Sequence, residues 1–188
     1  MKILVVGSGG REHAIIRALK KSPKAETIYA LPGNGGIAAY AICVEGSATD
    51  IDRVVSFSKD NGIDFVVVAP DNPLVLGMVD ALNEAGIATF GPRANAAILE
   101  GSKVFSKNLM KKYGIPTARY ETFDDAHAAV AYIEKMNEYP VVIKADGLAL
   151  GKGVIIAQNF AEAQDAVKSI MEDKAFGASG NHIVVEQF

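Results

Sequence analysis

The sequence is short of the residues that build metal clusters, disulfides and membrane spans. Of its 188 residues one is cysteine, three are histidine and none is tryptophan. A single cysteine, Cys43, excludes an internal disulfide and a thiolate cluster, and we expect it to be a small core residue. His13, His127 and His182 do not have the spacing of a metal site. No apolar run approaches the ~20 residues of a membrane helix.

Neither sign of charge dominates. Nineteen basic and 22 acidic residues give a formal net charge of −3, which offers no electrostatic reason to expect nucleic acid or a membrane surface as a partner. The apolar start, Ile3–Val6, is too short for a signal peptide. The hydrophobic content of 49% indicates a globular core. We therefore expect a cytoplasmic protein whose partners are small molecules.

The first half of the chain alternates between strand and helix patterns, which is typical of βαβ units on a parallel sheet. Polar loops that follow such strands lie on one edge, where open α/β sheets bind ligands. The expected strands are Ile3–Val6, Thr27–Ala30, Phe65–Val68 and Ala88–Phe90, and the expected helices are Arg11–Lys20, Ile51–Asn61 and Leu74–Ala85.

The second half begins with two expected helices and continues as a compact α+β unit. Gly114-Ile115-Pro116 separates the two parts. Asp124 and Asn159 are expected to start the helices that follow them. The expected elements are helices Ala94–Leu99 and Lys103–Tyr113, strand Arg119–Thr122, helix Asp124–Met136, strands Val141–Lys144 and Val154–Ala157, helix Ala161–Met171 and strand His182–Glu186.

In the segment Val141–Ile156, two β-branched runs flank a loop with three glycines and two lysines, Lys144 and Lys152. It does not fit the Walker A motif, because Gly153 stands where the hydroxyl residue belongs and Val154–Ile156 predicts a strand rather than a helix. One interpretation is a flexible lid that covers a nucleoside triphosphate with backbone N–H groups and lysines. The other is an ordinary glycine-rich hairpin with solvated lysines.

Gly7–His13 follows the first strand and resembles the dinucleotide fingerprint G-x-G-x-x-G. Glu12 replaces its third glycine, and the second strand ends at Tyr29–Pro32 without the acidic residue that holds a ribose. What remains is phosphate binding at a helix N-terminus. The alternative is a tight βα turn without a ligand.

Three more loops are expected on the same edge: Pro32–Gly36, Ala69–Leu74 and Phe90–Pro92. Together they favour a pocket for a phosphorylated, hydroxyl-rich small molecule. Asp71 is either a polar contact in that pocket or a helix cap. No Ser/His/Asp or Cys/His arrangement points to a catalytic nucleophile.

Lys103 and Lys107 are one helical turn apart. They either form a solvated helix face, or Lys103 points to the nucleotide that Lys144 would contact.

Six motifs in this order resemble the phosphoribosylamine–glycine ligase family, also called glycinamide ribonucleotide synthetases, over the whole chain. They are Gly7–Ala14, Pro32–Asn34, Pro73–Val75, Phe90–Pro92, Glu100–Lys103 and Lys144–Ala149 with Gly151–Val154.

The resemblance implies an α/β protein of the ATP-grasp superfamily. Residues 1–92 would be a Rossmann-like preATP-grasp domain on the phosphoribosylamine side, 93–115 a helical linker and 116–188 the small α+β lid, with the large ATP-grasp domain incomplete or missing. The family ligates glycine to 5-phosphoribosylamine in de novo purine biosynthesis, using ATP through a glycyl phosphate and releasing ADP and phosphate. Charge stabilisation by lysines and a metal ion suffices for this chemistry.

The resemblance also implies site residues. The ATP side would be Lys103, Lys144, Gly147, Gly151, Lys152, Gly153, Glu186, Gln187 and Phe188. The phosphoribosylamine side would be Gly9, Gly10, Pro32, Gly33, Asn34, Asp71 and Pro73. Asp71 replaces the glutamate usual in the family, so its reach is shorter.

The residues that bind Mg²⁺ or Mn²⁺ in this family would lie beyond Phe188, with no metal site and no catalytic residue within 1–188. We therefore expect the N-terminal portion of a longer, monomeric ligase that does not turn over alone. Other ATP-grasp ligases, a nucleotide-binding or assembly module, and an NAD-dependent dehydrogenase are the alternatives.

Overall fold

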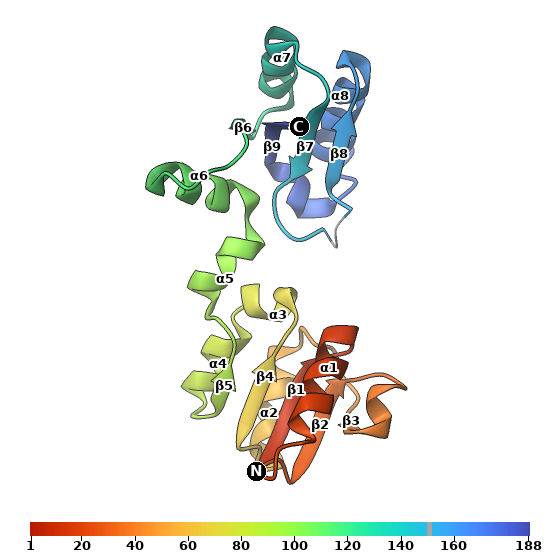
Figure 1. The fold of residues 1–188 in the computed structure, drawn as a ribbon, viewed down its shortest axis with the longest axis vertical. Coiled ribbons are helices and arrows are strands. Elements are labelled where there is room, and N and C mark those ends of the chain that lie inside the picture. The colour runs from red at the N-terminus through yellow and green to blue at the C-terminus, as the bar shows by residue number, and fades with distance from the viewer. Residues whose placement is uncertain (150–151) are drawn as a thin grey trace. The chain divides into compact units, whose positions relative to one another are not determined.

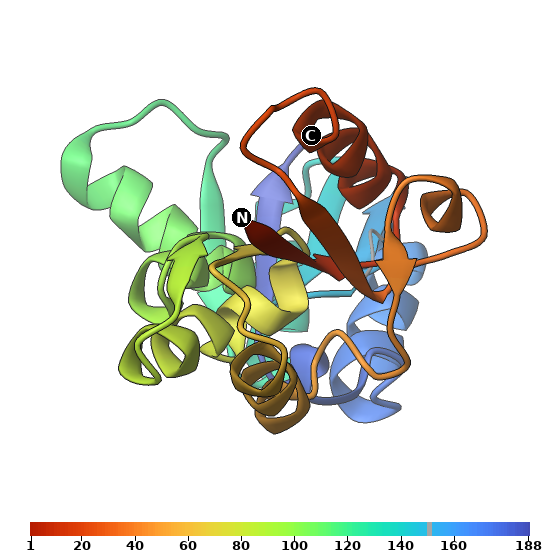
Figure 2. The ribbon, with the colours of Figure 1, turned by 90° about the horizontal axis from the view of Figure 1, so that it is seen from below.

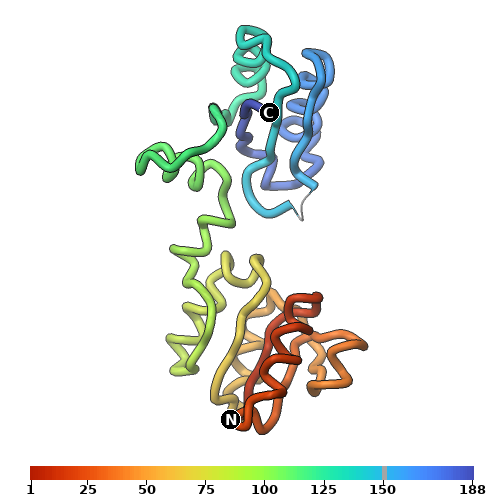
Figure 3. Tube along the Cα trace, viewed as in Figure 1, coloured from red at the N-terminus to blue at the C-terminus, as the bar shows by residue number. Residues whose placement is uncertain are grey.

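The structure, a computed structural model, describes residues 1–149 and 152–188. The chain forms two compact units, Met1–Ala97 and Ile98–Phe188. Figure 1 labels the elements of each unit, and the chain path can be followed in Figure 3.

The first unit is a parallel sheet with helices on both faces. Its five strands are in the order β3-β2-β1-β4-β5, and all neighbouring strands are parallel. The strands are β1 (Lys2–Gly7), β2 (Thr27–Pro32), β3 (Ile42–Cys43), β4 (Phe65–Val68) and β5 (Ala88–Phe90). The helices are α1 (Gly10–Leu19), the short η1 (Ile37–Ala39), α2 (Ile51–Asp60), α3 (Asp71–Val75) and α4 (Met78–Glu84).

Alternation along β1 explains the two helical layers. Ile3 and Val5 pack with Ile16 of α1, whereas Leu4 and Val6 pack with α2 and α4 on the opposite face. Figure 2 shows α1 on one side of β1 and α2 on the other. Because both faces are covered, Ile3–Val6 of β1 and Val66–Val68 of β4 are continuous buried apolar runs, as is typical of parallel strands.

The second unit is an antiparallel sheet in the order β6-β9-β7-β8. Helix α5 (Ala94–Gly101) leads into it from the first unit. The further elements are α6 (Lys103–Tyr113), β6 (Tyr120–Phe123), α7 (Ala126–Met136), β7 (Val141–Ala145), β8 (Val154–Ala157), α8 (Phe160–Val167), the π-helical η2 (Lys168–Glu172), the 3-10 helix η3 (Gly177–Asn181) and β9 (Ile183–Gln187).

One face of this sheet carries the core of the second unit. Ile143 of β7 and Val185 of β9 pack with Ile133 of α7 and Ile170 of η2, and all four are buried. Residues at the alternate positions point to the opposite face, which α7 and α8 do not cover.

The predicted α/β class and the parallel sheet are confirmed, but local details differ. The helix expected over Leu74–Ala85 is broken, because Gly77 takes a left-handed conformation (φ +89°) between α3 and α4. Asp125, not Asp124, caps α7 by accepting the Ala128 N–H at 2.7 Å. Asn159 caps α8 as expected.

Cys43 lies on the short edge strand β3, which the sequence pattern did not reveal. Its side chain is exposed, so the expectation of a core cysteine is wrong: an edge strand leaves one of its sides in solvent. Among residues 1–149 and 152–188 no helix is long and apolar enough to cross a membrane.

Candidate functional site

The loops after β1 and β2 are joined at the carboxyl edge of the parallel sheet. Gly33 N–H donates to the Gly7 carbonyl at 3.1 Å, and Asn34 Nδ2 donates to the Ser8 carbonyl at 2.6 Å. Asn34 Oδ1 also accepts the Ile37 N–H at 2.9 Å. The side chain of Asn34 therefore shapes this edge, and Pro32 lies half-buried at the end of β2.

The loop after β4 reaches the same edge. Arg11 of α1 donates to the Ala69 carbonyl at 3.4 Å. Asp71 is the first residue of α3, and its Oδ1 accepts the Asn72 N–H at 2.8 Å. Asp71 thus stands within the first turn of α3 rather than before a helix at Leu74, and Pro73 in the same turn is buried.

Glu12 explains why the third glycine of the dinucleotide fingerprint is missing. Its side chain is only 4% exposed, and Oε2 accepts the Gly9 N–H at 2.5 Å. A Cβ on Gly7 would lie 2.7 Å from Glu12, so the carboxylate occupies the space inside the turn. One of the N–H donors expected to meet an anion is therefore already bonded. Gly10, the first residue of α1, has open space around its Cα.

His13 was expected to pack near the first loop, but its ring lies beside Gly36 and Tyr40, which follow β2. Its ring centroid is 5.5 Å from that of Tyr40. His127 is exposed on α7, and His182 directly precedes β9.

The second unit has a sheet face that α7 and α8 leave uncovered, and the exposed part of this uncovered sheet face lies along β8 and is apolar. Val154 and Ile156 of β8 are 41% and 47% exposed. They lie opposite Lys144 and Val142 of β7 in the ladder. Solvated faces of antiparallel sheets normally carry polar residues, so these valine and isoleucine side chains indicate a surface suited to a flat apolar ligand.

A buried carboxylate lies on the same face. Glu186 of β9 is 6% exposed, and it pairs with Lys144 of β7 through Oε1 and with Lys107 of α6 through Oε2. Burial raises the pKa of the Glu186 carboxyl, but the two ammonium groups outweigh burial and hold it below its ordinary value. Glu186 is therefore ionised at neutral pH.

Asp146 joins α6 to the loop that follows β7. Its carboxylate accepts the Val104 N–H at 3.1 Å and the Ser102 hydroxyl at 3.1 and 3.2 Å. Ser102 Oγ in turn accepts the Phe105 N–H at 3.0 Å. The two side chains together satisfy N–H groups in the first turn of α6 that have no partner within the helix.

Lys103 makes a second link between the same two segments. Its ammonium donates to the Gly147 carbonyl at 2.7 Å. Burial lowers the pKa of the Lys103 ammonium and nearby Lys144 lowers it further, while Asp146 and Glu100 act in the opposite direction. The motifs Glu100–Lys103 and Lys144–Ala149, far apart in the sequence, therefore form one structure.

The loop after β7 needs glycine at two of its predicted positions for steric reasons. Gly147 has φ +90°, and a Cβ there would lie 2.9 Å from Ser179 Oγ. A Cβ on Gly153 would lie 2.7 Å from that of Ala149. Lys152 is exposed. Gly151, also predicted for this loop, lies outside the described residues together with Leu150.

The last three residues predicted for the ATP side lie at the end of β9, two within the strand and one after it. Glu186 and Gln187 pair with β7, and Gln187 N–H donates to the Arg119 carbonyl at 2.9 Å. Phe188 follows the ladder and is 73% exposed. A ligand that forms hydrogen bonds with backbone groups here would contact Phe188, because the strand pairing ends at Gln187.

Two residues of this site were missed from the sequence. Lys107 is named from the sequence only as the neighbour of Lys103 on one face of α6, and no role of its own was expected for it. Asp146 was noted only as part of a motif. Both act through side chains distant in sequence, which periodicity does not reveal.

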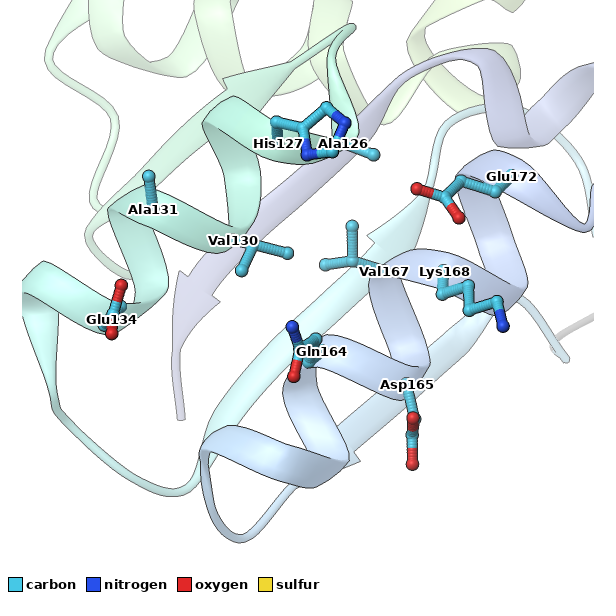
Figure 4. A pocket seen from close by; sticks show the side chains of 10 residues that line it. All are labelled: Ala126, His127, Val130, Ala131, Glu134, Gln164, Asp165, Val167, Lys168 and Glu172. Carbon is cyan, nitrogen blue, oxygen red and sulfur yellow. The ribbon is translucent and has the colours of Figure 1, made fainter.

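A separate groove of about 340 Å³ lies between α7 and α8, on the covered side of the sheet (Figure 4). It is lined by residues of both charges, including His127, Glu134 and Lys168. None of the predicted site residues lines it. Within 1–149 and 152–188 no three histidine, cysteine or acidic side chains gather as a metal site.

Comparison with known proteins places both units in one family. Residues 1–100 match the family described as "Phosphoribosylglycinamide synthetase, N domain" and residues 101–188 match "Phosphoribosylglycinamide synthetase, ATP-grasp (A) domain". The chain is 48% identical over 187 residues to a phosphoribosylamine–glycine ligase of Caldanaerobacter subterraneus subsp. tengcongensis. It is 50% identical over 188 residues to that of Agrobacterium fabrum. These matches cover all of this chain but only 45% and 44% of those proteins, so it spans less than half their length.

Solved structures give the same result for the fold. The crystal structure of a phosphoribosylamine–glycine ligase from Thermotoga maritima matches with a TM-score of 0.80 and 31% identity, over 100% of this chain and 44% of that one. The biotin carboxylase domain of a Hydrogenobacter thermophilus 2-oxoglutarate carboxylase also matches with a TM-score of 0.80, over 100% of this chain and 44% of that one. At 21% identity it is similar in fold alone. With both units matched and the lysines of the ATP-grasp unit gathered on one sheet face, the chain belongs to the phosphoribosylglycinamide synthetase family.

Proposed function

We propose that the uncovered sheet face of the second unit binds ATP. The observation that carries this proposal is the meeting of Lys103, Lys107 and Lys144 with two carboxylates beside the apolar residues of β8. Lys103 and Lys144 lie among the carboxylates of Glu186, Asp146 and Glu100, so a phosphate chain on this face would compete with those carboxylates for the two ammonium groups. The exposed side chains of Val154 and Ile156 supply apolar area for a base.

Each residue predicted for the ATP side has a role in this proposal. Lys103 and Lys144 contact phosphates, and Lys103 also holds the loop after β7 through the Gly147 carbonyl. The loop itself, with Gly151, Lys152 and Gly153, covers the phosphates. The chain at Glu186, Gln187 and Phe188 reads the adenine edge, with Phe188 offering the backbone groups beyond the ladder. In the proposed division of the chain into domains, residues 116–188 form the lid and residues 93–115 form the helical linker.

The carboxyl edge of the first unit is proposed to bind the phosphorylated sugar. Gly9, Gly10, Pro32, Gly33, Asn34, Asp71 and Pro73 would line that site. Support comes from the hydrogen bonds that join the loops after β1 and β2. Since Glu12 already bonds the Gly9 N–H, Gly10 at the N-terminus of α1 is the better phosphate donor.

The reaction proposed for the whole protein is ligation of glycine to 5-phosphoribosylamine, with ATP converted to ADP and phosphate through a glycyl phosphate. This chain's lysines would orient ATP and offset charge on its phosphates. Since no three histidine, cysteine or acidic side chains gather among residues 1–149 and 152–188, no metal ligand is proposed within them. Mg²⁺ or Mn²⁺ would be bound by residues beyond Phe188. The protein would act in the cytoplasm, as a monomer, on small molecules alone.

Titration with ATP tests the proposed nucleotide face. Replacing Lys144 with methionine removes a charge-assisted contact, and we expect ATP affinity to fall about tenfold. Lys168→Met removes an equal charge from the covered side of the sheet and should leave the affinity unchanged. Equal affinities for the two variants, or preference for NAD over ATP, would contradict the proposal.

The substrate pair is tested by coupled ADP release from the full-length protein, because these 188 residues are not expected to turn over alone. We expect ADP to form only when glycine and phosphoribosylamine are present together. Formation with bicarbonate instead would favour another ATP-grasp ligase.

A further inference from the structure

Glu186 is held between two lysines, and Lys107 has no direct part in the proposed contacts to ATP. Lys144 reaches Glu186 from β7, whereas Lys107 reaches it from α6. Because the carboxylate is buried, it needs a cation or hydrogen-bond donors at all times. One lysine would be enough to neutralise Glu186, so the second requires an explanation.

Lys107 is held firmly in place. Besides Glu186, its ammonium donates to Thr117 Oγ1 at 2.7 Å and lies 5.3 Å from the centroid of the Tyr120 ring. Tyr120 is the cross-strand neighbour of Glu186. In the part of the chain that the structure describes, Glu186 is the one side chain that pairs with Lys144. Lys144 is therefore the cation that can leave the carboxylate.

A phosphate chain on the open face competes with Glu186 for Lys144. If Glu186 had no other partner, moving Lys144 to a phosphate would leave a buried charge uncompensated, which is strongly unfavourable. With Lys107 in place, Glu186 stays paired when Lys144 moves. We infer that Lys107 is a positioning residue that releases Lys144 to the phosphates of the nucleotide by keeping Glu186 paired.

This inference rests on the proposed ATP site and is tested on the full-length protein by calorimetric titration. We expect Lys107→Met to lower ATP affinity about tenfold. Adenosine affinity should not change, because adenosine has no phosphate for Lys144 to contact. Lys107→Arg, which keeps the charge, should retain most of the ATP affinity.

Lys111→Met is the matched control. It removes the same charge one turn further along α6, where the side chain is exposed, and it should leave ATP affinity within about twofold of the original, because exposed charges interact weakly.

A second substitution separates this role from direct binding or folding. In Lys107→Met with Glu186→Gln, the neutral amide no longer retains Lys144, so ATP affinity should recover by at least about fivefold relative to Lys107→Met alone. No recovery, or equal loss of ATP and adenosine binding, would overturn the inference. Lys107→Gln, which keeps a donor for Thr117, replaces Lys107→Met if the latter does not fold.

The two proposals fail in different ways. Absence of ATP binding by the unsubstituted protein would remove the proposed function and this inference together. Normal ATP binding by Lys107→Met would remove the inference alone.

Discussion

Removing the carboxylate of Asp146 should break the link between the first turn of α6 and the glycine-containing loop that follows β7. Asp146 accepts the Val104 N–H at 3.1 Å and the Ser102 hydroxyl at 3.1 and 3.2 Å. Hydrogen bonds to a charged group contribute about 1.5–3 kcal/mol each, and a negative charge at a helix N-terminus adds about 0.5 kcal/mol. Because Asp146 is half-buried and water replaces part of these bonds, we expect Asp146→Ala to cost about 3 kcal/mol. Asp146→Asn keeps an acceptor for Val104 and should cost about 1 kcal/mol.

Amide hydrogen exchange measures this effect locally, together with urea unfolding of the whole chain. A loss of about 3 kcal/mol should speed exchange at Val104 and Phe105 more than 100-fold. Asp125→Ala is the control, since Asp125 caps α7 by a single bond to the Ala128 N–H at 2.7 Å. It should cost about 1 kcal/mol and leave α6 unaffected. The reasoning is refuted if Asp146→Ala costs no more than Asp125→Ala and the α6 amides stay protected.

Three further outcomes are expected. Gly180→Ala should destabilise the second unit by more than about 4 kcal/mol in urea unfolding, because the new Cβ would lie 2.1 Å from a backbone carbonyl oxygen of η2. Gly177→Ala is the control: its Cβ would lie in open space, and the φ of +57° should lower the free energy of unfolding by only about 1 kcal/mol. The folded-state pKa of Glu186 lies below its ordinary 4.5. The ionised carboxylate therefore stabilises the fold above that pH, and this stabilisation is lost as the pH falls through the folded-state pKa. Glu186→Gln should remove part of the acid dependence of unfolding, and a pH profile of stability that is unchanged between about pH 5 and 2 would contradict this. Ile156→Glu should lower ATP affinity by about tenfold or more through repulsion of phosphates, whereas Ile42→Glu, at a similarly exposed strand residue of the first unit, should not, as calorimetry can establish.

The local sequence pattern was sufficient to predict most of the helices and strands. The apolar run Ile3–Val6 could only be a buried strand, and the glycines that follow it had to form a turn. Because the carboxyl ends of parallel strands meet at one edge, the convergence of the loops after β1 and β2 followed directly. The hydrogen bond from Asn34 to the Ser8 carbonyl confirms that convergence.

The sequence-based expectations were wrong where a residue is compatible with two local structures and only tertiary packing selects one of them. Gly77 is compatible with a helix and with a left-handed break, and the structure takes the break. Cys43 suits a core as well as an edge strand, and β3 is too short to show a period of two. The domain boundaries inferred from the family, and the ligand contacts of the site residues, stay predictions.

The sequence by itself determined the α/β class, the order of most elements and, through motifs in a fixed order, the family. It also placed Lys103, Lys144 and Lys152 among the candidates. Only the tertiary structure decided which charges meet. Glu186 receives Lys107 and Lys144 from two other elements, and Asp146 caps a helix that begins 43 positions earlier. Electrostatic pairing depends on distance in space, and a linear pattern carries no record of which distant side chains the fold brings together.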